Sequence, residues 1–281
     1  MTTVTVAAVQ LSSGTDVTRN VHDVTELVNV AADRGATYIQ VPEYFNYLGP
    51  AKGFAGAAES IPGPTTTRMA AIALSRGVTL HLGSLLETSP TPGKFFNTSV
   101  VIGPAGEIVA TYRKVHLFDV DVPDAIVQRE SDVIAPGDEL VVLRLADVRL
   151  GLSICFDVRF PEMFRALAAS GADVFAIPAA FNAVTGRAHW EILIRSRAIE
   201  NHAFVIAAAQ VGTTKEGIAT YGHSLIVDPW GEVLAESTSE GPEVITATLN
   251  LDEAARRRRQ IAVMDFRRPD VYAAPVHVVD G

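Results

Sequence analysis

The chain has 281 residues, of which 48% are hydrophobic and 20% charged, a balance typical of a globular protein that buries a core without disulfides. The net charge of −9 argues against a general nucleic-acid binder, which would normally be basic. The chain has one cysteine, Cys155, which excludes an intramolecular disulfide and a cysteine-rich zinc site. It has no run of about 18 apolar residues, the length needed to span a membrane. Residues 1–11 lack the pattern of a signal peptide, so we expect a single cytoplasmic domain over residues 1–281.

The first half of the chain predicts strands that alternate with helices and then pair as hairpins. Apolar alternation indicates a strand at Val4–Gln10, and apolar residues at helical spacing predict a helix over Val17–Arg34, ended by Gly35. Further elements are expected at Tyr38–Val41 (strand), Thr65–Arg76 (helix), Val78–Leu86, Phe95–Ile102 and Glu107–Arg113 (strands). His116–Pro136 has little periodicity and much charge, which favours a long loop.

The second half repeats this outline of strand, helix, strand and hairpins. Strands are expected at Leu140–Leu145, Val148–Ile154, Val174–Ile177, Phe204–Ala209, Ser224–Val227, Glu232–Ala235 and Val244–Leu249. Helices are expected at Glu162–Ser170 and His189–Asn201, and an Arg-rich helix is expected after the last strand. This order indicates an α/β protein whose mixed sheets are covered by helices on their outer faces.

Three predicted strands end in side chains that could carry chemistry: Glu43, Lys114 and Cys155. In open α/β sheets, sites gather beyond the carboxyl ends of strands. Cys155 also precedes a helix that begins near Pro161, and unpaired N–H groups at a helix start lower a thiol pKa. A buried core cysteine is the alternative, because free cysteine is among the most buried residue types.

A set of ordered segments resembles the nitrilase superfamily of carbon–nitrogen hydrolases. They are Val41–Glu43, Tyr112–Phe118, Cys155–Glu162, Ala180–Asn182, His189–Glu191, Arg195–Glu200 and Tyr221–Ser224. The resemblance runs from about Val6 to Tyr272 in order and spacing. It implies a four-layer α-β-β-α sandwich, a Glu-Lys-Cys triad, and a homodimer or larger assembly.

The resemblance assigns a role to each member of the triad. Cys155 is the expected nucleophile and Glu43 the base that it needs. Lys114 and the backbone N–H of Phe156 are the expected donors to the oxyanion. Glu130 matches the family's second glutamate and is expected to position substrate or Lys114, although a solvated loop glutamate is the alternative. No cofactor is expected, and no metal, because no two histidines share helical spacing with a carboxylate.

The residues after Cys155 resemble the branch of omega-amidases and deaminated-glutathione amidases. Arg159 is expected to bind the substrate's carboxylate, with a salt bridge to Asp157 or Glu162 as the alternative. Thr185 is expected to add a hydroxyl to that carboxylate, unless it is only a turn residue. His116, Phe181 and Asn182 are expected to line the pocket, although a loop histidine with a backbone partner would also explain His116.

The sequence leaves the amide open. Residues 207–210 and 221–224 resemble the deaminated-glutathione amidases, whereas residues 118–123 resemble the omega-amidases. We therefore expect hydrolysis of a small carboxylate-bearing amide to acid and ammonia or amine, through a cysteine thioester. An N-carbamoyl hydrolase, a nitrilase and a non-catalytic protein of the same fold are the alternatives. The basic run Arg256–Arg259 is interpreted as a solvated helix face, so no nucleic-acid or membrane partner is expected.

Overall fold

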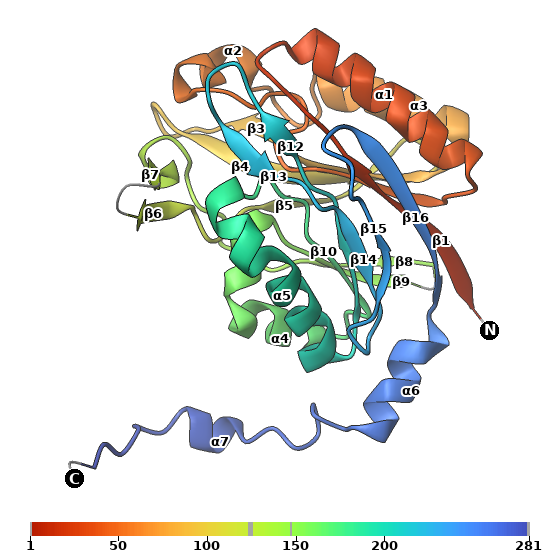
Figure 1. Ribbon diagram of the computed structural model, residues 1–281, viewed down its shortest axis with the longest axis vertical. Coiled ribbons are helices and arrows are strands. Elements are labelled where there is room, and N and C mark those ends of the chain that lie inside the picture. Colours follow the sequence, from red (N-terminus) through yellow and green to blue (C-terminus); the bar gives the residue numbers. More distant parts are fainter. Residues whose placement is uncertain (1, 123–125, 147, 280–281) are drawn as a thin grey trace.

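The computed structural model describes residues 2–122, 126–146 and 148–279, so the end of the 118–123 segment lies outside the described residues. Two six-stranded sheets face each other in this part of the chain (Figure 1). The first contains β1 (Thr3–Gln10), β2 (Tyr38–Val41), β3 (Thr79–Thr88), β4 (Phe95–Ile102), β5 (Ile108–Arg113) and β16 (Glu243–Asn250). The second contains β8 (Val142–Leu145), β9 (Val148–Leu152), β10 (Val174–Ala176), β11 (Phe204–Ala207), β14 (Leu225–Val227) and β15 (Val233–Glu236).

Both sheets are mixed. Their orders are β16-β1-β2-β3-β4-β5 and β15-β14-β11-β10-β9-β8. β1, β2 and β3 are parallel, as are β9, β10 and β11, and the outer strands pair antiparallel. The central strands β2, β10 and β11 are buried at every residue. Their sequences are therefore largely apolar and do not alternate between apolar and polar residues.

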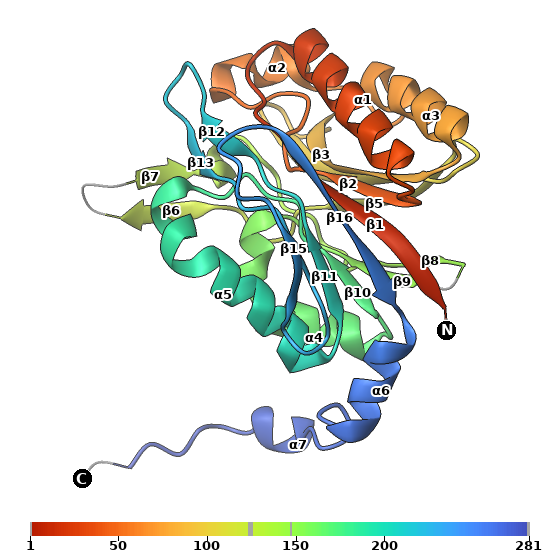
Figure 2. The same cartoon turned by 45° about the vertical axis from the view of Figure 1, so that its right-hand side comes forward.

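Helices cover the outer face of each sheet and complete the four layers (Figures 1 and 2). α1 (Val17–Asp33) and α3 (Pro64–Arg76) pack on the first sheet, and α4 (Pro161–Ala169) and α5 (Ala183–Asn201) pack on the second. Alternate side chains of β1 face opposite layers: Val6 and Ala8 join the core between the sheets, whereas Ala7 and Val9 pack beneath α1. The predicted four-layer arrangement is therefore confirmed.

The prediction of a long loop over His116–Pro136 is wrong. β6 (Asp119–Val122) and β7 (Ile126–Arg129) pair antiparallel as a small separate sheet, followed by the 3₁₀ turn η2 (Glu130–Asp132). The Asp-Val-Asp-Val sequence of β6 does alternate, with its Asp side chains exposed. The strand is short and highly charged, so its alternation was not recognised as a strand pattern. The hairpin belongs to neither main sheet.

The sequence also missed the beginning of α5 and a second small hairpin. α5 begins at Ala183 rather than at His189, because the Asn182 side chain caps it by accepting from Val184 N at 2.9 Å. β12 (Val211–Thr213) and β13 (Ala219–Tyr221) pair beside this beginning, where Asn182 and Thr220 form a bridge. The short helices η1 (Ala51–Gly53) and α2 (Phe54–Ala57) were not predicted either.

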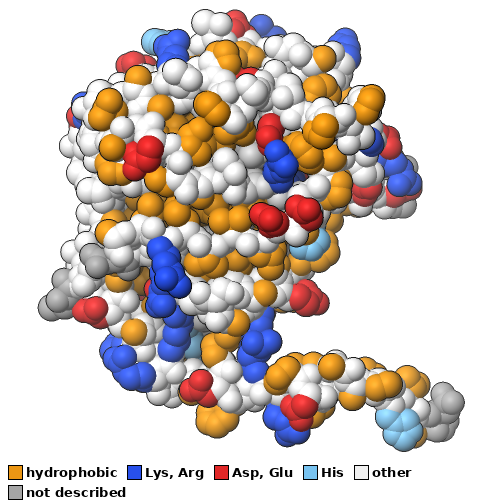
Figure 3. All heavy atoms as spheres, turned by 180° about the vertical axis from the view of Figure 1, so that it is seen from behind, with side chains coloured by type: hydrophobic (Ala, Val, Ile, Leu, Met, Phe, Trp, Pro, Cys, Tyr) orange, Lys and Arg blue, Asp and Glu red, His pale blue; other side chains and the backbone are white. Residues whose placement is uncertain are grey.

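The C-terminal segment leaves the body of the molecule. After β16 the chain forms α6 (Asp252–Gln260) and then runs outward through the short helix α7 (Pro269–Tyr272) (Figures 1 and 3). Phe266 and Tyr272 in this segment are 80% and 67% exposed. Among the described residues, no helix combines the length and apolar character needed to cross a membrane.

Candidate active site

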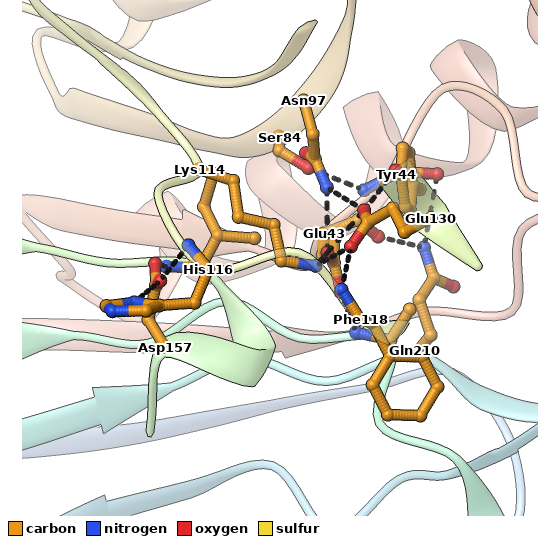
Figure 4. Close-up of polar contacts among 12 residues, drawn as sticks. Glu43, Tyr44, Ser84, Asn97, Lys114, His116, Phe118, Glu130, Asp157 and Gln210 are labelled. Atoms are coloured by element: carbon orange, nitrogen blue, oxygen red, sulfur yellow. Dashed lines mark hydrogen bonds and ion pairs between the residues drawn. The ribbon is translucent and has the colours of Figure 1, made fainter. Parts of the chain in front are cut away.

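Three strand ends meet at one end of the space between the sheets. Glu43 follows β2, Lys114 directly follows β5, and Cys155 begins the 3₁₀ helix η3 (Cys155–Arg159) after β9. The Lys114 ammonium donates to Glu43 Oε1 and to Glu130 Oε2, each at 2.9 Å (Figure 4). All four side chains are nearly fully buried. The structure therefore brings together the residues expected from the strand ends and adds Glu130 to them.

The Glu43 carboxylate is held from several sides. Its Oε1 accepts from Asn97 Nδ2 at 2.9 Å as well as from Lys114, and its Oε2 accepts from Ala180 N at 2.8 Å. The Gln210 side chain donates to the Glu43 carbonyl at 3.0 Å. These bonds fix the rotamer of the carboxylate, so that it can act on a reacting atom without prior reorganisation.

The chain turns sharply after Glu43. Tyr44 adopts a left-handed conformation with φ of 54°, and Ser84 of β3 accepts from the Tyr44 N–H through Oγ at 3.0 Å. Gly83 lies so close that a Cβ there would be 2.1 Å from the Val41 carbonyl oxygen. The glycine allows β3 to approach the end of β2 closely, which sets the position of Glu43.

Glu130 is the centre of a second group of hydrogen bonds. Its Oε1 accepts from the Tyr44 hydroxyl at 2.9 Å and from Asn97 at 3.2 Å, and its Oε2 accepts from Phe118 N at 2.6 Å (Figure 4). Burial raises the pKa of Glu130, but the charge of Lys114 and these donors outweigh burial and leave the pKa below its usual value. Glu130 is therefore ionised when Lys114 is charged.

Lys114 is a buried cation between two carboxylates. Burial lowers its pKa, but the charges of Glu130 and Glu43 prevail and raise the pKa well above the ordinary value. The ammonium therefore keeps its charge at neutral pH. An ammonium fixed in a dry cavity can stabilise a developing oxyanion much better than one in water.

Cys155 differs from the expected low-pKa thiol. Its backbone is left-handed, with φ of 49°, and its N–H donates to the Pro178 carbonyl at 2.9 Å. Burial is the largest cause that raises the pKa of the thiol well above its usual value, and the charge of Glu43 raises it further, against the effect of Lys114. The expected lowering was wrong because the thiol lies next to a carboxylate in a closed site. The thiol is protonated at neutral pH, so a base must accept its proton.

A cavity of about 340 Å³ opens above these groups. Eight predicted residues line its wall: Glu43, Lys114, Glu130, Cys155, Phe156, Phe181, Asn182 and Thr185. Other lining residues come from the η1–α2 segment, the β6–β7 hairpin and the β12–β13 hairpin. Thr185 lines the cavity, and its hydroxyl is buried without a hydrogen-bond partner among the described residues, so its donor and acceptor capacity is unused beside this wall.

Arg159 and His116 are not among the described residues that line the cavity. The Arg159 guanidinium lies 5.1 Å from the Phe181 ring centre and 5.8 Å from that of Phe156, and contacts His189 Nδ1 at 3.3 Å. It therefore borders the cavity through two lining aromatic rings. In the described part of the chain, it forms no ion pair with Asp157 or Glu162.

His116 supports the site from behind. Its Nδ1 is 2.8 Å from Asp157 Oδ1, and its ring stacks on Phe160. Asp157 also accepts from the Tyr112 hydroxyl at 2.7 Å and from Ile154 N at 2.8 Å. The buried Asp157 carboxylate therefore connects two segments: the one after β5 that contains Lys114 and His116, and the turn that contains Cys155.

Sequence reasoning missed several polar residues of the site, including Asn97, Asp157, Gln210 and Arg129. Asn97 and Gln210 lie within apolar runs, and a polar residue in a buried strand is the signal that could have found them. Arg129 lies in the hairpin that was taken for a loop. Among the described residues, no group of three His, Cys, Asp or Glu side chains could hold a metal ion.

Comparison with known proteins agrees with this geometry. The model of the carbon-nitrogen hydrolase family matches residues 5–259. The chain belongs to this family. It is 39% identical to the omega-amidase NIT2 of Homo sapiens over 273 residues, which are 97% of this chain and 98% of that protein. It is also 39% identical to the deaminated glutathione amidase of Synechocystis sp. (strain PCC 6803 / GT-S) over 264 residues, or 93% of this chain and 97% of that protein.

A solved structure agrees as well. The crystal structure of Saccharomyces cerevisiae Nit3, a member of branch 10 of the nitrilase superfamily, has a TM-score of 0.85 at 30% identity, and the match covers 95% of this chain and 97% of Nit3. The expected family, fold and enzyme class, a hydrolase of carbon–nitrogen bonds, are therefore confirmed.

Proposed function

We propose that this carbon–nitrogen hydrolase is an amidase that cleaves a small carboxylate-bearing amide through a thioester on Cys155. One observation carries the proposal: the Lys114 ammonium is fixed between Glu43 and Glu130 in the cavity that holds the only cysteine. The named substrates of the similar proteins, an omega-amide and deaminated glutathione, belong to this chemical class.

The first half of the reaction forms the thioester. Glu43 takes the proton of the Cys155 thiol as Sγ attacks the amide carbon, and the negative charge passes to the carbonyl oxygen. Lys114 and the Phe156 N–H stabilise this oxyanion; loss of one such donor costs on the order of 10²–10³ in rate. Glu43 then gives its proton to the leaving nitrogen, and the C–N bond breaks.

The second half releases the acid. Water takes the place of the leaving amine, and Glu43 removes a proton from it as it attacks the thioester. The same oxyanion donors act again, and the C–S bond breaks as Cys155 recovers its proton. Glu130 keeps Lys114 in place through both halves, because it accepts two hydrogen bonds from the ammonium.

The substrate's carboxylate is assigned to the side of the cavity formed by Phe156, Phe181 and Thr185. Thr185 offers a hydroxyl there that has no partner in the described structure. Arg159 lies against both rings and is half-buried, so it supplies a bidentate donor next to the same place. His116 is not assigned a substrate contact, because its ring is used by Asp157 and Phe160.

We also propose that the protein works as a homodimer or larger assembly in the cytoplasm, without a nucleic-acid or membrane partner and without a cofactor. The support for self-association is the exposed apolar surface of α5, where Ile192 is 67% exposed.

The test is an assay of ammonia and amine release from α-ketoglutaramate, deaminated glutathione, an N-carbamoyl amino acid and a simple nitrile. We expect turnover of one or both of the first two compounds and none by Cys155→Ala. With a slow substrate, mass spectrometry should find an acyl group on Cys155. Turnover of the nitrile or carbamoyl compound alone would overturn the assignment, and activity of Cys155→Ala would overturn the mechanism.

A further inference from the structure

A second arginine reaches the catalytic cavity from the β6–β7 hairpin. Arg129 is the last residue of β7 and lines the cavity together with Gln128. The next residue is Glu130, whose carboxylate holds Lys114. Arg129 therefore reaches the cavity wall from the chain segment that also carries Glu130, and its own side chain is exposed whereas that of Glu130 is buried. Arg159 borders the cavity elsewhere, against the Phe156 and Phe181 rings.

The charge of Arg129 is available to a ligand. Its cross-strand neighbour is Asp119, and the two charges interact. The Asp119 carboxylate is already used, since Oδ1 accepts from Ser131 N at 2.9 Å and Oδ2 from Ser131 Oγ at 2.5 Å. Within the described ranges, no carboxylate lies within ion-pair distance of the Arg129 guanidinium. An exposed arginine at a cavity wall is a ready partner for an anionic group.

The proposed reaction gives the two sides of the cavity different roles. The leaving nitrogen must lie beside Glu43, because that carboxylate protonates it. Glu43 is joined to Glu130 through Asn97 and Lys114, so the leaving part of the substrate extends toward this side of the cavity. The acyl part extends the other way, toward Phe181 and Thr185.

We propose that Arg129 binds a carboxylate on the leaving amine, so that this chain prefers amides of amino acids or short peptides over primary amides. This inference rests on the proposed function. It decides whether the released product is ammonia or an amine, which the proposed function left open. Hydrolysis still breaks one C–N bond and adds one water, and the carboxylate on the leaving side is unchanged. The guanidinium only binds and orients it.

The experiment compares three amides that share one acyl group, 2-oxoglutarate joined through its distal carboxyl. The leaving groups are ammonia, glycine and glycinamide, which is neutral but matches glycine in shape. kcat/KM is measured for wild type, Arg129→Ala, Arg129→Lys and Arg159→Ala. Val127→Ala serves as the control, since this residue of the same strand is 72% exposed and is not part of the cavity wall.

We expect Arg129→Ala to lower kcat/KM for the glycine amide about tenfold more than for the other two amides. This is the low end for a charge-assisted pair, because Arg129 is exposed and water screens it. Arg129→Lys should recover part of the loss. Arg159→Ala should lower all three values by a similar factor, because all three carry the acyl carboxylate.

Equal losses for the three amides in Arg129→Ala, or no loss, would overturn the inference. So would a wild-type enzyme that cleaves the primary amide but not the glycine amide. In both cases the amidase assignment would stand, since it requires only that wild type cleaves one of these acyl amides. Failure of wild type on all three would instead reject the proposed function itself.

Discussion

The charge of Lys114 controls the other groups in the cavity. It keeps Glu130 ionised despite burial, and it only partly offsets burial and the charge of Glu43, which raise the pKa of the Cys155 thiol well above its usual value. The thiol remains protonated, so Glu43 must accept its proton before or during nucleophilic attack. A buried cation between two carboxylates is also costly to leave unpaired, and removing one partner typically destabilises a protein by about 3–5 kcal/mol.

This electrostatic arrangement predicts opposite effects of one substitution on two measurements. Glu43→Gln should abolish amide hydrolysis, because no base remains. It should also lower the thiol pKa, because the charge of Glu43 and its hydrogen bond both raise it. The measurement is the rate of alkylation of Cys155 by iodoacetamide against pH, which is specific because the chain has one cysteine.

In wild type the alkylation rate should be low at pH 7 and still rise above pH 9.0, the ordinary thiol value. In Glu43→Gln the rise should move to lower pH. Glu26→Gln is the control, because this exposed carboxylate belongs to α1, which covers the outer face of the first sheet. A rise that stays in place, or moves to higher pH, in Glu43→Gln would contradict the assigned electrostatics.

Single residues differ in how far the sequence predicts them. Glu43, Lys114 and Cys155 follow apolar runs, so a strand-end argument finds them without knowledge of the three-dimensional structure. Glu130 was found only through the resemblance, because its charged surroundings carry no periodic signal. Asn97 could not be found in that way, because its role depends on which strands become neighbours. The thiol pKa was missed because the sequence argument considered only the helix start after Cys155, and not the burial of the thiol and the charge of Glu43, which together raise its pKa.

At the scale of secondary structure, the contact between β2 and β3 sets the geometry of the site. β3 pairs in parallel with β2 as far as Leu82, and the β3–β4 register shifts between Leu82 and Leu85. Gly83 lies in this irregular stretch, against the backbone that leads to Glu43. Glycines within strands often mark such close approaches.

Gly83→Ala should therefore lower kcat/KM, although Gly83 is not part of the cavity wall. The new Cβ would be 2.1 Å from the Val41 oxygen and 2.2 Å from the Pro42 oxygen, so the backbone before Glu43 must move. A displacement of about 1 Å can cost on the order of 10²-fold in rate, and overpacking typically destabilises by about 1–3 kcal/mol. The measurements are kcat/KM and the free energy of unfolding by urea.

Gly56→Ala is the matched control. A Cβ at this position of α2 meets no atom within 4 Å, so stability should stay the same or rise slightly. Wild-type kcat/KM in Gly83→Ala would show that Glu43 does not depend on this contact.

Long elements were predicted more faithfully than short ones. The helix expected over Val17–Arg34 is found as α1, and apolar residues of its periodic pattern, such as Val24 and Val28, are fully buried, because a 17-residue helix repeats its pattern several times. β6, β7, β12 and β13 have three or four residues each, too few for a period to be recognised. These short hairpins line the cavity, so the sequence predicts the catalytic centre better than the surface that selects the substrate.

At the scale of the whole molecule, one outer layer has apolar surface that the described chain leaves uncovered. Trp190 of α5 is fully buried against the second sheet, but Ile192 and Ile199 on the same helix are 67% and 47% exposed. The C-terminal segment, which extends away from the body, adds more exposed apolar side chains (Figure 3). Apolar side chains gathered on one helix in this way favour association with another protein surface.

We therefore expect self-association through α5. Light scattering of the wild type should give at least twice the chain mass of 30.0 kDa. Ile192→Glu should shift the mass toward that of one chain, because it places a carboxylate in a surface that must lose water, a cost of several kcal/mol without a partner. Leu74→Glu is the control, because this residue of α3 is 58% exposed on the opposite outer layer. A wild type of single-chain mass would refute self-association, whereas an Ile192→Glu protein that keeps the larger mass would place the interface elsewhere.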